Sequence, residues 1–154
     1  MGTGVEDCMA CDLSAGRQPL PGGLIHRTDH WLIEHCIGPL GVGTLVVKPE
    51  RHVLHVADLT SAEAAEMGPL LTRTAEVVTR LCTPAQVYVC LWSHAKGVAA
   101  HIHFVVQPVR EPKNKLPGTY GPALQVAMFA RNKSPNSAEV AAFAEKARAE
   151  FAAP

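Results

Sequence analysis

The sequence predicts one α+β domain over residues 1–154, built on an antiparallel sheet of about five strands with one main helix and a carboxyl-terminal helix. Three observations support this fold class: short β-rich runs broken by Gly and Pro, one long helical pattern that begins at a capping signature, and an amphipathic stretch near the carboxyl end. The 154 residues, 47% of them hydrophobic, suffice to bury a single core. We expect an amino-terminal segment over 1–18 and a loop and helix over 108–154.

Three strands are expected in the first third of the chain. Residues 24–26 and 31–36 form short runs of β-forming residues. The run 44–47 is rich in β-branched residues and is followed by Pro49, which cannot donate to a strand ladder. Gly and Pro residues between the runs predict tight turns, so the three strands should form an antiparallel meander.

The main helix is predicted over residues 60–81. Thr60, followed three residues later by Glu63, forms a capping-box signature, and apolar residues then recur at helical spacing. Pro69 lies inside this pattern and removes one backbone hydrogen bond. We therefore expect a kink near Gly68 or a break into two segments.

The second half of the chain predicts two more strands and a last helix. The strands are expected over 86–92 and 101–107. Residues 108–122 are rich in Pro, Gly and Lys, which predicts a long loop. Ser137 can cap the last helix, whose apolar stripe consists of Val140, Phe143, Ala147 and Phe151.

Charge and composition exclude several classes of function. Fourteen basic and fourteen acidic residues cancel, so no basic surface is expected of the kind that binds nucleic acid or an anionic membrane without sequence preference. We see no secretory leader and no apolar stretch long enough to span a bilayer, and we expect a cytoplasmic protein. Five cysteines fit a reducing compartment, and those in apolar runs are expected to be buried thiols: Cys36, Cys82 and Cys90.

The other two cysteines form the pattern Cys8-x-x-Cys11. Their two-residue spacing lets both thiolates reach one tetrahedral zinc ion. A redox pair is the alternative, although the chain lacks the strand-to-helix context of thioredoxin-like motifs. Zinc would need two further ligands to complete the tetrahedron.

The densest polar pattern lies at residues 101–107, where strand alternation would send two histidines to one face. His101 and His103 would lie about 7 Å apart on that face, too far for both to bind one metal ion comfortably. They should therefore have different roles, although inert histidine pairs on exposed strands are also common. The expected polar face carries His101, His103, Val105 and Gln107, and the expected core face carries Ile102, Phe104 and Val106.

Taken in order, these motifs resemble the histidine triad (HIT) superfamily. The resemblance implies the HIT-like fold, in which the antiparallel sheet carries the main helix on one face. It covers most of residues 8–110 and rests on Cys8-x-x-Cys11, the run 43–52, the capped helix, and His101-x-His103 followed by an apolar run and Pro108.

The resemblance also implies which residues bind metal and which one reacts. In zinc-bearing members the ligand positions correspond here to Cys8, Cys11, His52 and His101, and His55 is the nearest substitute should His52 lie away from the cysteines. In catalytic members the second triad histidine, here His103, attacks the α-phosphorus of a nucleotide and forms a nucleotidyl-histidine intermediate. HIT proteins are usually dimers, so a homodimer is implied as well.

The chain departs from the family pattern at the third triad histidine, which falls at Val105. Valine can neither hydrogen-bond a phosphate oxygen nor protonate a leaving group. Gln107 shares the expected face of His103, and His94 lies in the loop before the strand. These two residues are the candidates to assist His103, although His94 is equally typical of an exposed loop histidine without function.

A second departure concerns substrate contacts. The acidic residue that grips ribose in many HIT hydrolases falls at Cys36, and the Gly-Gln-Ser/Thr stretch before the triad is missing. Ser93, His94, Lys96 and Gly97 stand in its place. The residues predicted to contact substrate are His35, Cys36, Ser93 and Lys96.

Our first interpretation is a nucleotidyl hydrolase or transferase that acts on a nucleoside phosphate ester, anhydride or phosphoramidate. Its partner would be a small phosphate-containing molecule, expected to be a nucleotide. Val105 favours a different class, a zinc-stabilised HIT-like binding protein without turnover. Cys36 favours a third, a HIT scaffold adapted to a non-nucleotide substrate.

Overall fold

Residues 7–110 and 119–154 are described in the computed structural model. Five antiparallel strands form one sheet in the order β1-β2-β3-β7-β4, and β5 and β6 form a separate hairpin. The strands are β1 (Leu24–Arg27), β2 (Trp31–His35), β3 (Leu45–Pro49), β4 (Gln86–Leu91), β5 (His94–Ala95), β6 (Val98–Ala99) and β7 (Phe104–Val109). The helices are α1 (Met9–Ser14), the 3-10 helix η1 (Val56–Asp58), α2 (Ser61–Cys82), α3 (Gly121–Arg131) and α4 (Ser137–Ala152). The predicted α+β class and antiparallel sheet are confirmed.

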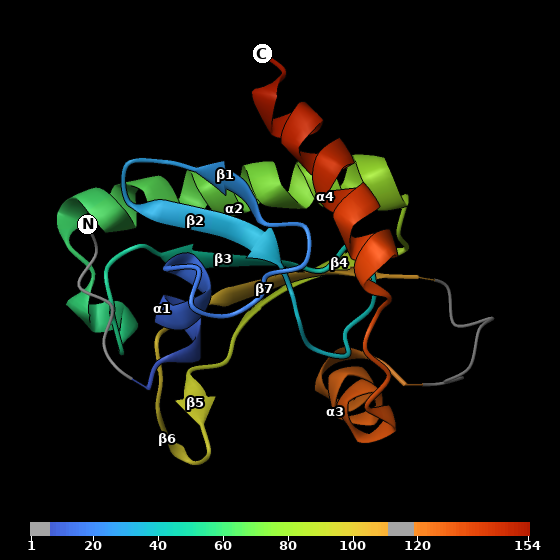
Figure 1. The fold of residues 1–154 in the computed structure, drawn as a ribbon, viewed down its shortest axis with the longest axis horizontal. Helices are drawn as coiled ribbons and strands as arrows, with labels where there is room; N and C mark the ends of the chain where they lie inside the picture. The colour runs from blue at the N-terminus through green and yellow to red at the C-terminus, as the bar shows by residue number, and fades with distance from the viewer. Residues whose placement is uncertain (1–6, 111–118) are drawn as a thin grey trace.

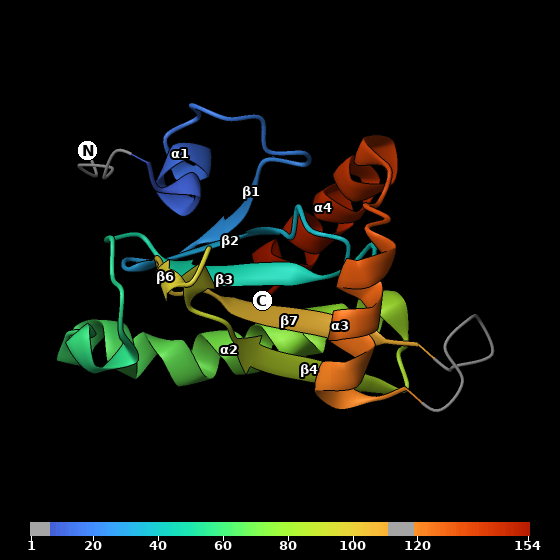
Figure 2. The same cartoon turned by 90° about the horizontal axis from the view of Figure 1, so that it is seen from below.

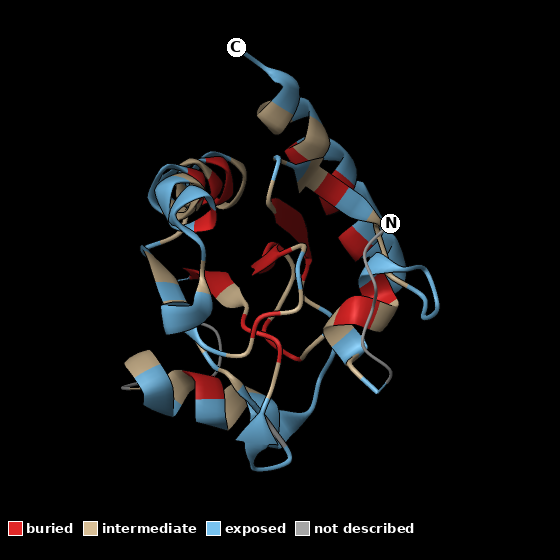
Figure 3. Ribbon diagram, turned by 90° about the vertical axis from the view of Figure 1, so that its left-hand side faces the viewer, coloured by how far each residue is buried: buried red, intermediate tan, exposed pale blue. Residues whose placement is uncertain are grey.

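Helices cover both faces of the sheet. Helices α2 and α4 lie on one face, and α1 and α3 lie on the other (Figures 1 and 2). Buried residues gather on the sheet and on the sides of the helices that face it (Figure 3). The main core lies between the sheet, α2 and α4, and its fully buried members include Trp31, Ile33, Leu45, Val47, Val77, Val78, Val106 and Ala147.

The register of the sheet decides which side chains face the core. Opposing residues of antiparallel strands share a face, and Val47 lies opposite Phe104, both in the α2 core. One residue along, Glu34 lies opposite Val46, and Val46 lies opposite Val105. These three side chains therefore belong to the opposite face, the one covered by α1 and α3.

Strand β7 begins at Phe104, three residues later than predicted. Strand β3 ends at Pro49, which has no N–H to continue the ladder, and its carbonyl accepts a hydrogen bond from the His101 ring at 2.9 Å. The backbone N–H of Ile102 bonds instead to the carbonyl of Val53. Residues 101–103 therefore lie outside the sheet, and the alternation of side chains along a strand does not determine the directions of His101 and His103.

Helix α2 is continuous, so the expected break at Pro69 does not occur. Pro69 lies on the exposed side of the helix, as does Ala65, whose carbonyl the proline cannot satisfy. That carbonyl can bond to water, which explains how the helix accommodates the proline. In the described part of the chain, no helix is long and apolar enough to cross a membrane.

Two helices and one hairpin were not predicted. Helix α1 spans the cysteine pair, and α3 begins close to the end of the expected loop over 108–122, of which residues 111–118 lie outside the described residues. The expected loop after β4 is a hairpin, where Lys96 and Gly97 both have positive φ angles, 51° and 81°, as a two-residue turn requires.

The amino-terminal end of α2 is fixed by hydrogen bonds around Glu63. The predicted capping box is confirmed, with Thr60 and Glu63 each bonding the other's backbone N–H through its side chain. Arg51 donates to both carboxylate oxygens of Glu63, at 3.0 and 2.9 Å. These bonds to Arg51, the largest cause, lower the pKa of Glu63 to about 2. Since Arg51 precedes His52, the cluster also anchors the segment that carries this histidine.

Replacing Glu63 with glutamine should destabilise the protein at neutral pH by about 1–2 kcal/mol, less than the full linkage value because Arg51 is half exposed. A carboxyl whose pKa is lowered in the folded state stabilises the fold above its unfolded pKa of 4.5 and loses that contribution as pH falls toward 2. Urea unfolding of wild type and Glu63→Gln across this range measures the effect. A difference in unfolding free energy that does not change with pH would contradict the pairing.

Candidate metal centre and active site

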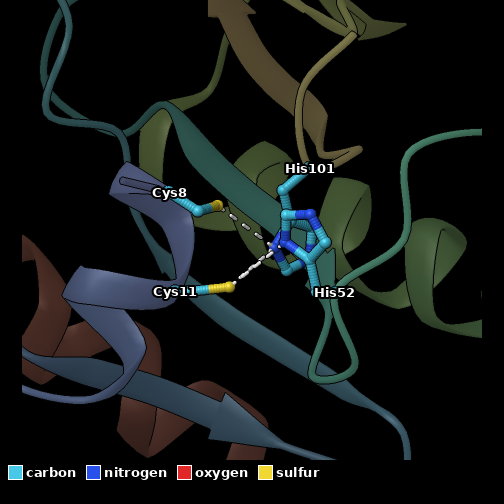
Figure 4. Close-up of side chains that lie close together, drawn as sticks. All are labelled: Cys8, Cys11, His52 and His101. Carbon is cyan, nitrogen blue, oxygen red and sulfur yellow. Dashed lines mark hydrogen bonds between the residues drawn. The ribbon is translucent and has the colours of Figure 1, made fainter. Parts of the chain in front are cut away.

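Four side chains from three separate segments converge beside α1 (Figure 4). Cys8 is the N-cap of α1 and Cys11 lies in its first turn, while His52 follows β3 and His101 precedes β7. The ligand atoms of these residues all lie within 4.8 Å of one another. None of the five cysteines, all of which lie in the described part of the chain, is in a disulfide, so Cys8 and Cys11 are not joined to each other.

The spacing of this cluster fits a tetrahedral zinc ion. Zn–S bonds of about 2.3 Å and Zn–N bonds of about 2.1 Å place sulfur and nitrogen ligands about 3.6 Å apart. Cys11 Sγ lies 3.3 Å from His52 Nδ1 and 3.5 Å from His101 Nδ1, and Cys8 Sγ lies 3.9 Å from His101 Nδ1. The cluster can therefore hold a metal ion, and its two sulfurs and two nitrogens are the ligands that zinc prefers.

His101 is oriented for this role by the end of β3. Its Nε2–H donates to the carbonyl of Pro49 at 2.9 Å, which leaves the lone pair of Nδ1 directed at the two thiols. Burial is the main cause that lowers the pKa of His101 to about 4, so the imidazole is neutral at physiological pH. His55 is exposed and lies outside the cluster, so the substitute ligand is not needed.

His103 lies just before β7 and is half-buried. Its Nδ1–H donates to the backbone carbonyl of His101 at 3.1 Å, which fixes the tautomer and leaves the lone pair on Nε2. Among the described residues, Nε2 has no hydrogen-bond partner. Nε2 is therefore the ring nitrogen of His103 that is available for chemistry.

Gln107, predicted to assist His103, is only 1% exposed and its side chain is already engaged. Its Nε2 donates to the carbonyl of Leu40 at 3.4 Å, and its Oε1 accepts from Gln125 of α3 at 2.9 Å. Gln125 in turn accepts from the indole N–H of Trp92 at 3.0 Å. Gln107 thus anchors α3 to the sheet and is not available to a phosphate. This role of Gln107 was not predicted, because α3 itself was not predicted.

His35, predicted to contact substrate, also has a structural place. It lies opposite Leu45, faces the α4 side of the sheet with its ring edge toward Phe143, and is 1% exposed. Its Nδ1 bonds to the carbonyl of Cys36, and its Nε2 accepts from the N–H of Gly43. Both ring nitrogens are thus engaged with main-chain groups, and the predicted substrate contact of His35 stays a prediction. Cys36 is largely buried, and this burial raises the pKa of its thiol.

His94 and Lys96 belong to the β5–β6 hairpin, and Ser93 is the residue before it. The hairpin projects from the α1 side of the sheet (Figure 1). The side chains of His94 and Lys96 are exposed. Among the described residues, no hydrogen bond or ion pair joins any of the three to His103. Their predicted roles stay predictions.

The structure places one further charged pair on this face that sequence reasoning missed. Lys48 of β3 donates to Glu34 of β2 at 2.7 Å, and both side chains are almost completely buried. A lysine inside the β-rich run before Pro49 was the available signal, since a buried lysine requires a partner.

The similarity of this chain to known proteins is found in its structure. No protein-family model matches the sequence, and no curated protein matches it. A Hit-like protein involved in cell-cycle regulation from Bartonella henselae has a TM-score of 0.72 at 16% identity, covering 95% of this chain and 97% of its own. A zinc-bound histidine triad family protein from Mycobacterium smegmatis has a TM-score of 0.66 at 20% identity, covering 95% and 94%.

A third similar structure is a hypothetical histidine triad nucleotide-binding protein from Sulfolobus tokodaii, with a TM-score of 0.70 at 12% identity over 94% of this chain and 91% of that one. Identities this low establish the fold alone. The chain therefore has the histidine triad fold along almost its whole length, as the sequence motifs implied.

Proposed function

We propose that this protein is a nucleotidyl hydrolase or transferase that acts at the α-phosphorus of a nucleoside phosphate ester, anhydride or phosphoramidate. The observation that carries the proposal is the state of His103: its tautomer is fixed by the His101 carbonyl, and Nε2 keeps its lone pair. His101 is committed to the cysteine cluster. One imidazole therefore remains to act as a nucleophile.

In the proposed reaction, Nε2 of His103 attacks the α-phosphorus and forms a P–N bond. The bond from phosphorus to the leaving group breaks, and the leaving group departs with the bonding electrons and takes up a proton. Water or another acceptor then attacks phosphorus, and the P–N electrons return to His103 while the acceptor loses its proton. The hydrogen bond from Nδ1–H to the His101 carbonyl supports the positive charge that the ring carries between the two steps.

The choice of a nucleotide as the substrate is based on the shared fold. The solved structure from Sulfolobus tokodaii is described as nucleotide-binding, and it shares this fold. The overall charge of the chain is zero, which fits a small ligand held by local contacts better than a long polyanion.

We also propose that the cysteine–histidine cluster binds one structural zinc ion. Two thiolates and two imidazoles close the coordination shell, so bound zinc would stabilise the fold and would not activate water. A zinc-bound structure with this fold, from Mycobacterium smegmatis, supports this choice of metal. The metal would join α1 to the segment that follows β3 and to the segment that precedes β7, which lie at the same end of this antiparallel pair.

A second candidate function is ligand binding without turnover. Val105 takes the place of the third histidine, and the structure shows that Gln107 is buried and bonded to α3. Neither side chain can protonate a leaving group. Cys36, in place of an acidic residue, keeps open a related alternative in which the scaffold takes a non-nucleotide substrate.

We further propose a homodimer that pairs along β4. This strand lies at the edge of the sheet, and Val89 on it is 45% exposed. A shallow groove of about 550 Å³ runs between β4 and α2, with Leu71, Ala75 and Val89 among its lining residues. An apolar edge strand beside such a groove is suited to pairing with a second copy.

Elemental analysis of protein purified without added metal should find one zinc ion per chain. Chelation should lower the melting temperature, and Cys11→Ser should lose the metal because the site then lacks one thiolate. Cys82→Ser is the matched control and should retain zinc. Folded, metal-free protein that does not take up zinc would contradict the proposed site.

Loss of His103 should abolish phosphotransfer. We expect His103→Ala to reduce turnover by about a thousandfold or more while zinc content and folding stay unchanged. His55→Ala, which removes an exposed histidine outside the site, is the control and should keep full activity. The assay uses adenylated and guanylated amines and dinucleoside polyphosphates, with mass spectrometry of protein quenched without acid to find a nucleotidyl adduct.

An adduct on another residue, or equal activity in His103→Ala, would overturn the mechanism. Neither adduct nor turnover with any of these substrates would favour the binding protein instead. Equilibrium dialysis with the same nucleotides would then show whether the site binds them.

The dimer is tested by sedimentation velocity. Wild type should sediment as a dimer at micromolar concentration, and Val89→Glu should sediment as a monomer because it places a charge at the paired edge. Val126→Glu, at an exposed position of α3, is the control and should remain dimeric. A monomeric wild type would refute the proposal.

A further inference from the structure

The ion pair between Lys48 and Glu34 lies on the same sheet face as the candidate site. Lys48 is 0% exposed and Glu34 is 4% exposed. Nζ of Lys48 lies 2.7 Å from Oε1 of Glu34, so the two charges are directly hydrogen-bonded. The pair joins two neighbouring strands, β2 and β3, that are already held by a full ladder.

Stabilising this sheet does not account for the pair. Removing two charges from water costs free energy that their attraction only partly returns, and apolar residues in the same positions often serve stability as well or better. Buried pairs of this kind need further hydrogen bonds to be tolerated. The other contacts of the Lys48 ammonium group therefore indicate what the pair does.

Lys48 makes a second hydrogen bond, to the backbone carbonyl of Ala10 at 2.8 Å. Ala10 lies between Cys8 and Cys11, inside α1. This helix has only six residues, and the side chain of its N-cap residue makes no capping bond. A helix so short is not stable alone, so its position depends on contacts with the rest of the fold.

The end of β3 thus contacts both halves of the metal centre. Lys48 binds the segment that carries the cysteines, and the adjacent Pro49 accepts the Nε2–H of His101. His52 follows three residues after Pro49. One short piece of backbone therefore sets the relative positions of the thiols and the imidazoles.

We propose that Lys48 is a positioning residue of the metal centre, which holds the Cys8–Cys11 turn in place for the metal, with Glu34 as the second acceptor of its buried ammonium group. This inference rests on the proposed zinc site. It concerns preorganisation: groups that orient metal ligands through one hydrogen bond contribute substantially to metal affinity. Without the bond from Lys48, α1 would have to be ordered by the metal itself.

The test compares zinc affinity in three variants by competition with a chromophoric chelator. Lys48→Met together with Glu34→Gln removes the bond to Ala10 and leaves no unpaired buried charge, so the sheet should fold. Its zinc dissociation constant should rise about ten- to a hundredfold. Glu34→Gln alone is the matched control, because the glutamine amide oxygen can still accept from Lys48 and the bond from Lys48 to Ala10 is kept, so its affinity should stay within about threefold of wild type.

Cobalt(II) absorption provides a second readout. Wild type and Glu34→Gln should show the sulfur-to-cobalt charge-transfer band of a two-cysteine site, while the double variant should need more cobalt to reach it. Lys48→Met alone should weaken zinc binding at least as much as the double variant, since it also leaves Glu34 unpaired.

The outcomes separate this inference from the zinc proposal. If wild type binds no zinc, the metal site itself fails. If wild type binds zinc and the double variant binds it equally well, only the role of Lys48 is overturned. Equal weakening in Glu34→Gln, or a double variant that does not fold with saturating zinc, would also overturn it, because the pair would then serve the sheet.

Discussion

The termination of β3 at Pro49 is the constraint on which the candidate site depends. The β3–β7 ladder ends where Val47 lies opposite Phe104, and Pro49, two residues later, has no N–H to extend it. The Pro49 carbonyl instead accepts a hydrogen bond from the His101 ring at 2.9 Å. The segment before β7 is thereby released from the sheet. His101 turns toward the thiols, and His103 remains half-buried with its Nδ1 held by the backbone. The end of this ladder thus separates the histidine of the cysteine–histidine cluster from the histidine proposed as the nucleophile.

The sheet divides structural and chemical roles between its two faces. The face toward α2 and α4 is apolar, and even its one buried histidine, His35, has both ring nitrogens bonded to main chain. The other face carries Lys48 and Glu34 under α1 and the Gln107 network under α3. The buried side chains of Lys48, Glu34, Gln107 and Gln125 on this face are paired, which fixes both covering helices in defined positions.

Local signals in the sequence predicted most elements and the cysteine pair of the cluster, while the family resemblance implied its two histidines. The capping box, the β-rich runs and the Cys8-x-x-Cys11 spacing each depend on a few neighbouring residues, so they could be recognised without tertiary information. The burial of Gln107 could not, because it depends on Gln125, eighteen residues away, in a helix whose apolar pattern is weak. The face that His35 occupies could not be recognised either, because it depends on the register between β2 and β3. A shift by one residue in that register would move the side chain to the other face of the sheet.

The paired state of Gln107 narrows the chemistry that the proposed mechanism can perform. With Val105 beside it, the β7 strand offers no proton donor to a leaving group. An amine leaves from phosphorus only after protonation, whereas a phosphate leaves an anhydride as a stable anion. A nucleophile without a nearby acid therefore reacts faster with substrates whose leaving group needs no proton. Within the proposed mechanism, His103 favours anhydrides over phosphoramidates, unless the substrate or a group brought by the acceptor supplies the proton.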